Sequence, residues 1–181
     1  MSDIQNQNEN KSSGNMDAGI PENKKLVRLQ NAFSWSPMVY SSVISDRLYH
    51  WPNPPYKKET RIPIYWLARR GLELFLVNSS DETLDLVSVG TGGCATTDDS
   101  VVSITDEVGY IYHDVKPNEA VKIDEYDDFY DLDYLLQVSL RIESKKEGVL
   151  DILTWPEKGG IGETVLMWNN GDNGKVTITK V

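Results

Sequence analysis

The segment DEYDDFYDLDY, residues 124–134, concentrates the residues of this chain whose types and spacing could do chemistry. It places six acids and three tyrosines within eleven residues and contains no Lys or Arg. Carboxylates at this density could hold a cation, present an acidic surface to a basic partner, or face water in a loop before a strand. Which of these uses applies depends on how the elements on either side position the segment.

Cation binding is one hypothesis for this segment. A calcium loop of the EF-hand type needs acids at alternate positions, a central glycine and a closing glutamate, and the segment has no glycine and a different spacing. A loop at the edge of a β-sandwich could still hold calcium with the help of backbone carbonyls. No metal ligand is assigned, and the candidate carboxylates are those of Asp127, Asp128, Asp131, Asp133, Asp98, Asp99 and Asp106.

Partner binding is the second hypothesis, because aromatic side chains alternate with the acids. Tyrosine is enriched at interface hot spots, and carboxylates steer a basic partner toward the surface. The alternative is that Phe129 and Tyr134 tuck under the rim of a sandwich while the acids discourage edge-to-edge association. We predict a partner-binding surface formed by Asp124, Glu125, Tyr126, Asp127, Asp128, Phe129, Tyr130, Asp131 and Asp133.

The sequence gives less support to a cysteine nucleophile, a phosphate site or a zinc site. Cys94 would act as a nucleophile only if His113 and Asp114 approached it, and alternation explains His113 as an outward strand residue. The glycine-rich stretch from Gly90 to Asp99 has no lysine and no helical pattern after it, so it predicts a flexible loop and not a phosphate site. Two histidines and one cysteine give too few soft ligands for zinc, and nothing in the sequence indicates a cofactor.

Tryptophans offer an alternative function. Trp51 and Trp155 each precede a proline and are predicted to be exposed, whereas Trp66 and Trp168 lie in strand-like runs and are predicted to be core residues. Exposed tryptophans and loop acids could serve a carbohydrate-binding or small hydrolase sandwich, and the geometry of the carboxylate pair would decide between these functions.

The charge composition of the chain restricts the class of partner that it can bind. The net charge is −10: residues 1–60 carry seven Lys/Arg against six Asp/Glu, and residues 61–181 carry 11 against 22. An acidic body repels phosphate backbones, so we expect no nucleic-acid partner. No apolar run is long enough to span a membrane or to form a secretory signal, and a single cysteine fits a reducing cytoplasm.

Local patterns divide the chain into three parts. Residues 1–25 are polar and predict a disordered tail, and residues 26–60 predict an arm or connector with a short helix starting at Ser36–Pro37. This arm could pack on its own domain or on a partner. Residues 61–181 show about ten short strands separated by turn signals. Among these turns, NSSDET is expected to close a hairpin, and NNGDNG is expected to form a tight reversal.

The clearest alternation runs through residues 134–143. Tyr134, Leu136, Val138, Leu140 and Ile142 share one face, which predicts that this face lies in the core. No long helical period follows residue 61, so parallel βαβ units are not expected. The sequence predicts an all-β, antiparallel β-sandwich, immunoglobulin-like. It is expected to be a non-enzymatic, cytoplasmic module that binds a basic protein partner, with an inhibitor or immunity-type protein as a sharper version.

Overall fold

The computed structural model describes residues 25–37, 59–97, 100–106 and 109–181. The predicted disordered tail, the predicted helix beyond Pro37 and the exposed position predicted for Trp51 fall outside these ranges. So do Asp98 and Asp99, and only the backbone of Asp106 is described.

Within these ranges the regular secondary structure consists almost entirely of β-strands. One 3-10 helix, η1 (Asp131–Asp133), interrupts them. The strands are β1 (Arg28–Gln30), β2 (Pro63–Arg70), β3 (Glu73–Asn78), β4 (Leu84–Thr97), β5 (Ser100–Asp106), β6 (Ile111–Val115), β7 (Glu119–Glu125), β8 (Leu135–Ser144), β9 (Gly148–Thr154), β10 (Glu157–Lys158), β11 (Thr164–Trp168) and β12 (Val176–Lys180).

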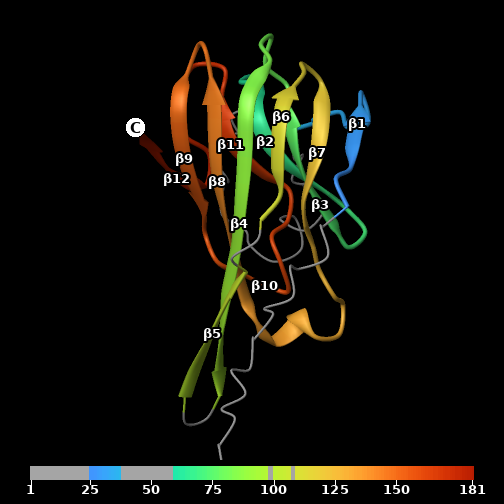
Figure 1. Cartoon of the computed structure of the whole chain (residues 1–181), viewed down its shortest axis with the longest axis vertical. Coiled ribbons are helices and arrows are strands. Elements are labelled where there is room, and N and C mark those ends of the chain that lie inside the picture. The colour runs from blue at the N-terminus through green and yellow to red at the C-terminus, as the bar shows by residue number, and fades with distance from the viewer. Residues whose placement is uncertain (1–24, 38–58, 98–99, 107–108) are drawn as a thin grey trace, which may run out of the picture.

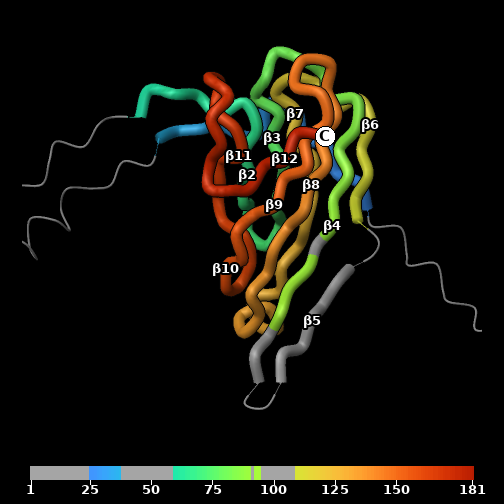
Figure 2. Tube along the Cα trace, turned by 90° about the vertical axis from the view of Figure 1, so that its left-hand side faces the viewer, coloured from blue at the N-terminus to red at the C-terminus, as the bar shows by residue number. Residues whose placement is uncertain are grey.

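The strands form two sheets that pack face to face (Figure 1). Sheet A has the order β1-β7-β3-β2-β11, and sheet B has the order β12-β9-β8-β4-β5, with β6 pairing to β4 and β10 to β8. All of these pairings are antiparallel. Figure 2 shows β2 and β11 of sheet A on one side of the sandwich and β4 and β8 of sheet B on the other. The hairpin of β4 and β5 extends past one end of the sandwich (Figure 1). The predicted antiparallel sandwich is confirmed, and its immunoglobulin-like character stays a prediction.

The main core lies between the two sheets and follows the alternation of the strands. On β8, Val138, Leu140 and Ile142 point inward and are buried, while Ser139 and Arg141 point outward and are exposed. Each fully buried aliphatic side chain contributes about 1.5–3 kcal/mol relative to an exposed one. The alternation predicted for this strand is therefore confirmed, and it fixes which face of sheet B meets water.

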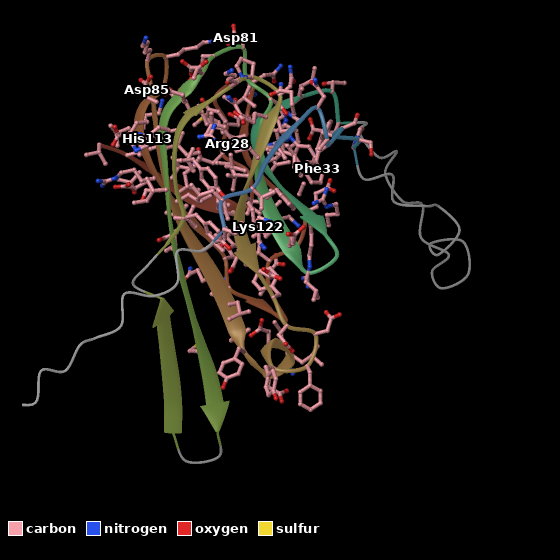
Figure 3. All side chains as sticks on the ribbon, turned by 45° about the vertical axis from the view of Figure 1, so that its right-hand side comes forward. Arg28, Phe33, Asp81, Asp85, His113 and Lys122 are labelled. Atoms are coloured by element: carbon pink, nitrogen blue, oxygen red, sulfur yellow. The ribbon has the colours of Figure 1, made fainter. Side chains whose placement is uncertain are left out.

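A second apolar cluster lies on the outer face of sheet A and is covered by the N-terminal arm, residues 25–37. Phe33 of the arm lies 5.2 Å from the ring of Phe75 and meets the ring of Trp66 edge-on at 6.4 Å. Residues 26–37, the described part of the predicted arm, pack on their own sandwich in this way (Figure 3). The cluster consists of Trp66, Ala68, Phe75, Val77 and Ala120, with Val27, Leu29, Phe33 and Trp35 packed on it.

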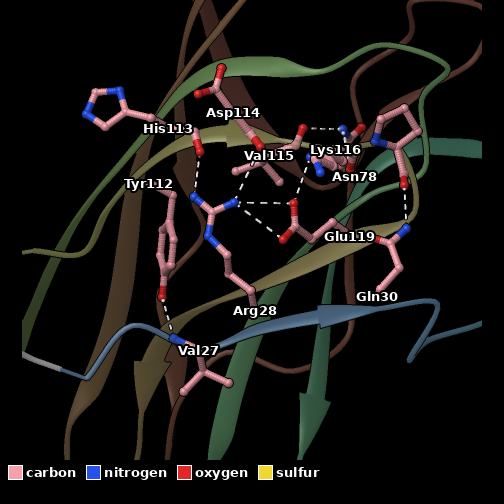
Figure 4. A network of polar contacts seen from close by, with 11 residues as sticks. Val27, Arg28, Gln30, Asn78, Tyr112, His113, Asp114, Val115, Lys116 and Glu119 are labelled. Atoms are coloured by element: carbon pink, nitrogen blue, oxygen red, sulfur yellow. Dashed lines mark hydrogen bonds and ion pairs between the residues drawn. The ribbon is translucent and has the colours of Figure 1, made fainter.

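Polar contacts hold the arm at the edge of sheet A (Figure 4). The Arg28 guanidinium donates through Nη1 to both carboxylate oxygens of Glu119 at 3.4 Å and through Nη2 to the carbonyl of His113. Its positive charge also lies 5.5 Å from the centre of the Tyr112 ring. Gln30 donates to the carbonyl of Pro117 at 2.9 Å. These contacts fix β1 beside β7, so the arm is an integral edge of the fold.

The glycine-rich stretch is a strand and not the predicted loop. Gly90 to Thr97 complete β4, which pairs with β8 on one side and with β5 on the other. A Cβ at Gly93 would lie 2.7 Å from Leu136 Cδ2, so the close approach of β8 requires glycine there. Backbone pairing on both sides compensates for the low strand propensity of glycine.

Two polar turns connect the sheets, and only one of them has the predicted form. The hairpin predicted at NSSDET is wrong, because the strands on either side of it belong to different sheets. The tight reversal predicted at NNGDNG is confirmed, since Gly171 has a φ of +83° and Met167 bridges Asn173. NSSDET joins β3 of sheet A to β4 of sheet B, and NNGDNG joins β11 of sheet A to β12 of sheet B. The first crossing is organised by Asn78, whose buried side-chain amide donates to the carbonyls of Glu82, Val115 and Lys116 at 2.9–3.1 Å. A polar turn pattern indicates a change of direction but does not say which sheet the next strand joins.

Candidate interaction surface

The acidic segment spans the connection between the two sheets at the end of the sandwich where β10 lies (Figure 1). Asp124 and Glu125 complete β7, and η1 precedes β8. We call residues 127–133, which leave the sheets altogether, the rim surface. A segment that changes sheet must leave both backbone ladders, and this places its side chains at the rim, away from the core.

Hydrogen bonds within the rim surface fix its backbone. One carboxylate oxygen of Asp127 accepts the amides of Phe129 and Tyr130, both at 2.8 Å. The carboxylate of Asp131 in turn accepts the amide of Asp127 at 2.7 Å. The amides of Tyr130 and Phe129 hold the pKa of the Asp127 carboxyl below its usual range, because their hydrogen bonds stabilise its charged form. The rim surface is thus preorganised by its own acids, which lowers the entropy that binding would cost.

Two aromatic rings stand out from the rim surface. Phe129 is 78% exposed and Tyr130 is 71% exposed, and their rings meet edge to face with centroids 5.2 Å apart. Leu132, in η1, is 55% exposed. The alternative in which Phe129 tucks under the rim is therefore wrong for Phe129, whereas Tyr134 is half-buried. Large apolar side chains gathered in one exposed stretch mark an interaction site more often than scattered ones do.

Tyr126 is the one predicted surface residue that cannot meet a partner, because its side chain is buried. Arg69 lies over its ring at 4.9 Å, and Gly160 packs so closely that a Cβ there would lie 2.6 Å from Tyr126 Cδ2. Burial raises the pKa of Tyr126, and the nearby carboxylate of Asp124 adds to the effect. This residue anchors the start of the rim surface to the β10–β11 connection.

The structure adds apolar residues that the sequence did not single out for this surface. Leu135 is 43% exposed and opposes Lys158 of β10. Leu132 faces Gly159, whose Cβ would lie 3.8 Å from Leu132 Cδ2. Trp155, predicted to be exposed, is 59% exposed just before β10. The exposure of Leu135 could have been predicted, because it lies on the solvent-facing side of the β8 alternation. Its neighbours could not, because they depend on the pairing of β10 with β8, for which the sequence has no pattern.

The charge of the segment is only partly balanced. Lys122 makes ion pairs with Glu125 and, at 3.2 Å, with Glu73. Burial by itself would lower the pKa of Lys122, but the carboxylates of Glu125 and Glu73 outweigh it and raise that pKa above its usual value. Lys158 lies 3.7 Å from Asp133, and both side chains are well exposed. The segment itself has six carboxylates and no Lys or Arg, so it keeps a net negative charge that attracts cationic groups.

The alternative chemistries do not come together among the described side chains. No group of three or more His, Cys, Asp or Glu side chains in that part of the chain is arranged to hold a metal ion. His113 of β6 pairs with Leu86 of β4, and Cys94 lies eight residues after Leu86 on the same strand. At about 3.3 Å per residue this separates them by roughly 26 Å, far beyond hydrogen-bond reach. The predicted outward position of His113 is confirmed.

Comparison with known proteins yields no relative from which to borrow a function. No family model, curated protein or solved structure matches this chain. Among the described residues, no helix is long and apolar enough to cross a membrane. Function must therefore be argued from the surface itself.

Proposed function

We propose that this protein is a non-enzymatic binding module whose rim surface takes a protein partner with a basic surface. The observation that carries the proposal is the exposed pair of Phe129 and Tyr130, held by Asp127 within a cluster of carboxylates. The aromatic rings supply area to be desolvated, and the surrounding acids supply long-range attraction and register.

The proposal favours an inhibitor or immunity-type role in the cytoplasm over a catalytic one. A small protein with a net charge of −10 associates readily with a basic active site, such as that of a nuclease. Leu132 extends the apolar area of the rim surface, and Leu135 and Trp155 flank it. Binding would require little rearrangement of the backbone, because Asp127 and Asp131 already fix it.

The test uses two defined probes of equal length: a labelled peptide of lysine, leucine and tryptophan, and its counterpart with glutamate in place of lysine. We expect only the cationic peptide to bind, and we expect Phe129→Ala combined with Tyr130→Ala to weaken it about tenfold or more. Binding should weaken as salt rises from ~50 mM to ~500 mM, because screening shortens the reach of the carboxylates.

Matched controls separate the rim surface from general acidity. Asp128→Asn removes one rim charge, whereas Asp81→Asn removes a charge whose side chain is 82% exposed at the other end of the sandwich (Figure 3). Ile111→Ala removes an exposed apolar side chain from β6. Equal loss in Asp81→Asn and Asp128→Asn, or binding that does not change with salt, would refute the proposal.

A further inference from the structure

The outer face of sheet B contains a groove that the rim surface does not use. It has a volume of about 530 Å³ and lies over β4, β8, β9 and β12. That volume is within the range of small-molecule sites. The strands at this position are paired on both sides, apart from the edge strand β12, so the floor offers few unpaired backbone groups for adding a peptide strand.

Strand register arranges the groove as two parallel rows. One row runs Ser88, Arg141, Asp151, Thr179, and the next runs Gly90, Ser139, Leu153, Thr177. Neighbouring side chains within a row are about 4.8 Å apart, and the rows are about 6.7 Å apart. The hollow lies where the second row has only a glycine and a serine. Ser139 Oγ lies 2.9 Å from the position that a Cβ at Gly90 would take, so that the glycine lets the serine hydroxyl lie close over β4.

The centre of the first row is a bidentate ion pair. Arg141 donates through Nε and Nη2 to the two carboxylate oxygens of Asp151 at 2.7 and 2.8 Å. Their side chains are 49% and 40% exposed, so the guanidinium and the carboxylate both face the groove's solvent. A planar pair of this kind presents N–H donors and oxygen acceptors side by side and carries no net charge.

The remaining groove side chains match the same kind of ligand. Ser88, Ser139, Thr177 and Thr179 contribute hydroxyls, which both donate and accept. Leu153 is 42% exposed and offers an apolar patch beside them. The groove is neutral in a chain of net charge −10, so neither a basic nor an anionic ligand has its charge complemented here.

From this arrangement we propose that the outer face of sheet B binds a neutral oligosaccharide. The ligand's hydroxyls would pair with the two rows, and the C–H face of a sugar ring would lie on Leu153. This site differs from a carbohydrate site built on Trp155 and the acids of the rim surface, because none of those residues is among the described residues that line the groove. The proposal is independent of protein binding at the rim surface.

The experiment titrates the full chain with a panel of neutral tetrasaccharides of glucose, mannose and xylose, followed by calorimetry. We expect at least one to bind, Ser139→Phe to abolish measurable binding by filling the hollow, and Arg141→Lys to weaken it about tenfold or more because lysine lacks the planar fork. Arg70→Lys, at an exposed ion pair on sheet A, is the matched control and should bind as the wild type does.

Two outcomes would overturn the proposal. One is that no sugar in the panel binds the wild type at millimolar concentration. The other is that binding survives both Ser139→Phe and Arg141→Lys in variants that keep the wild-type melting temperature. Loss of the cationic peptide in Ser139→Phe would also overturn it, since the groove would then belong to the protein partner.

Discussion

The three phenylalanines of the chain provide a graded test of the architecture, because they occupy three different environments. Phe75 is fully buried between sheet A and the arm, Phe33 is a partly buried residue of the arm, and Phe129 is exposed on the rim surface. The same change to alanine at each position removes the same atoms, so differences in stability report the environment alone.

The expected losses follow from burial. Phe75→Ala leaves a cavity in a packed cluster and should cost about 4 kcal/mol. Phe33→Ala loses the contacts with Phe75 and Trp66 but only part of a buried ring, so it should cost about 2 kcal/mol. Phe129→Ala should change the free energy of unfolding by less than about 0.5 kcal/mol. For a chain of this length each kcal/mol lowers the melting temperature by about 2–4 °C.

Urea unfolding of the three variants measures these losses, and amide exchange reports whether β1 stays docked through the bond from the Lys122 amide to the Val27 carbonyl. The reasoning predicts the order Phe75, Phe33, Phe129. If Phe33→Ala matches Phe129→Ala in both stability and exchange, the arm does not pack on sheet A. If Phe129→Ala is as costly as Phe33→Ala, the ring is not an exposed contact residue and the rim surface loses its main support.

Three further changes test the connections. Gly160→Ala should destabilise by about 3 kcal/mol, since its φ of +98° is strained for alanine and its Cβ would collide with Tyr126, whereas Gly148→Ala, at φ +78° with open space around it, should cost only about 1–2 kcal/mol. The pKa of the Asp127 carboxylate is lowered on folding, so its contribution to the free energy of unfolding is complete above about pH 4 and is lost as the pH falls through the lower folded value. The amide signals of Phe129 and Tyr130 should therefore shift in NMR spectra only in that acidic range, and a shift near neutral pH would contradict this. Asn78→Ala should cost about 2 kcal/mol in thermal unfolding, because the buried carbonyl of Val115 and the partly buried carbonyls of Glu82 and Lys116 lose a donor. A cost below about 0.5 kcal/mol would show that the crossing does not depend on Asn78.

The sandwich could be predicted because period-2 alternation is a local property. The inward set of β8 follows directly from which residues are apolar, and so does the exposure of Ser139 and Arg141. The strand character of Gly90 to Thr97 could not be predicted this way, because glycine carries no alternation and the strand is formed by pairing with β5 and β8. Sheet assignment failed at NSSDET for a similar reason, since the choice of sheet depends on partners distant in sequence.

The candidate surface was predictable in part. Composition alone located the segment from Asp124 to Asp133, but burial of Tyr126 depends on Arg69 and Gly160, which lie far away in sequence. The groove on sheet B had no sequence signal at all. Serines, threonines and one Arg–Asp pair are ordinary on a wet strand face, and they converge only because four strands align in register.

The two proposed surfaces differ in charge, and that difference makes them separable in one measurement. The rim surface attracts a cationic partner through carboxylates that salt screens, so its affinity must fall as ionic strength rises. The groove balances Arg141 against Asp151 at contact distance, and a neutral ligand gains nothing from the long-range field of the chain. Sugar affinity should therefore stay nearly constant over the same range of salt. If both affinities fell together, sugar binding would depend on the carboxylates that salt screens, and its assignment to the neutral groove would be wrong.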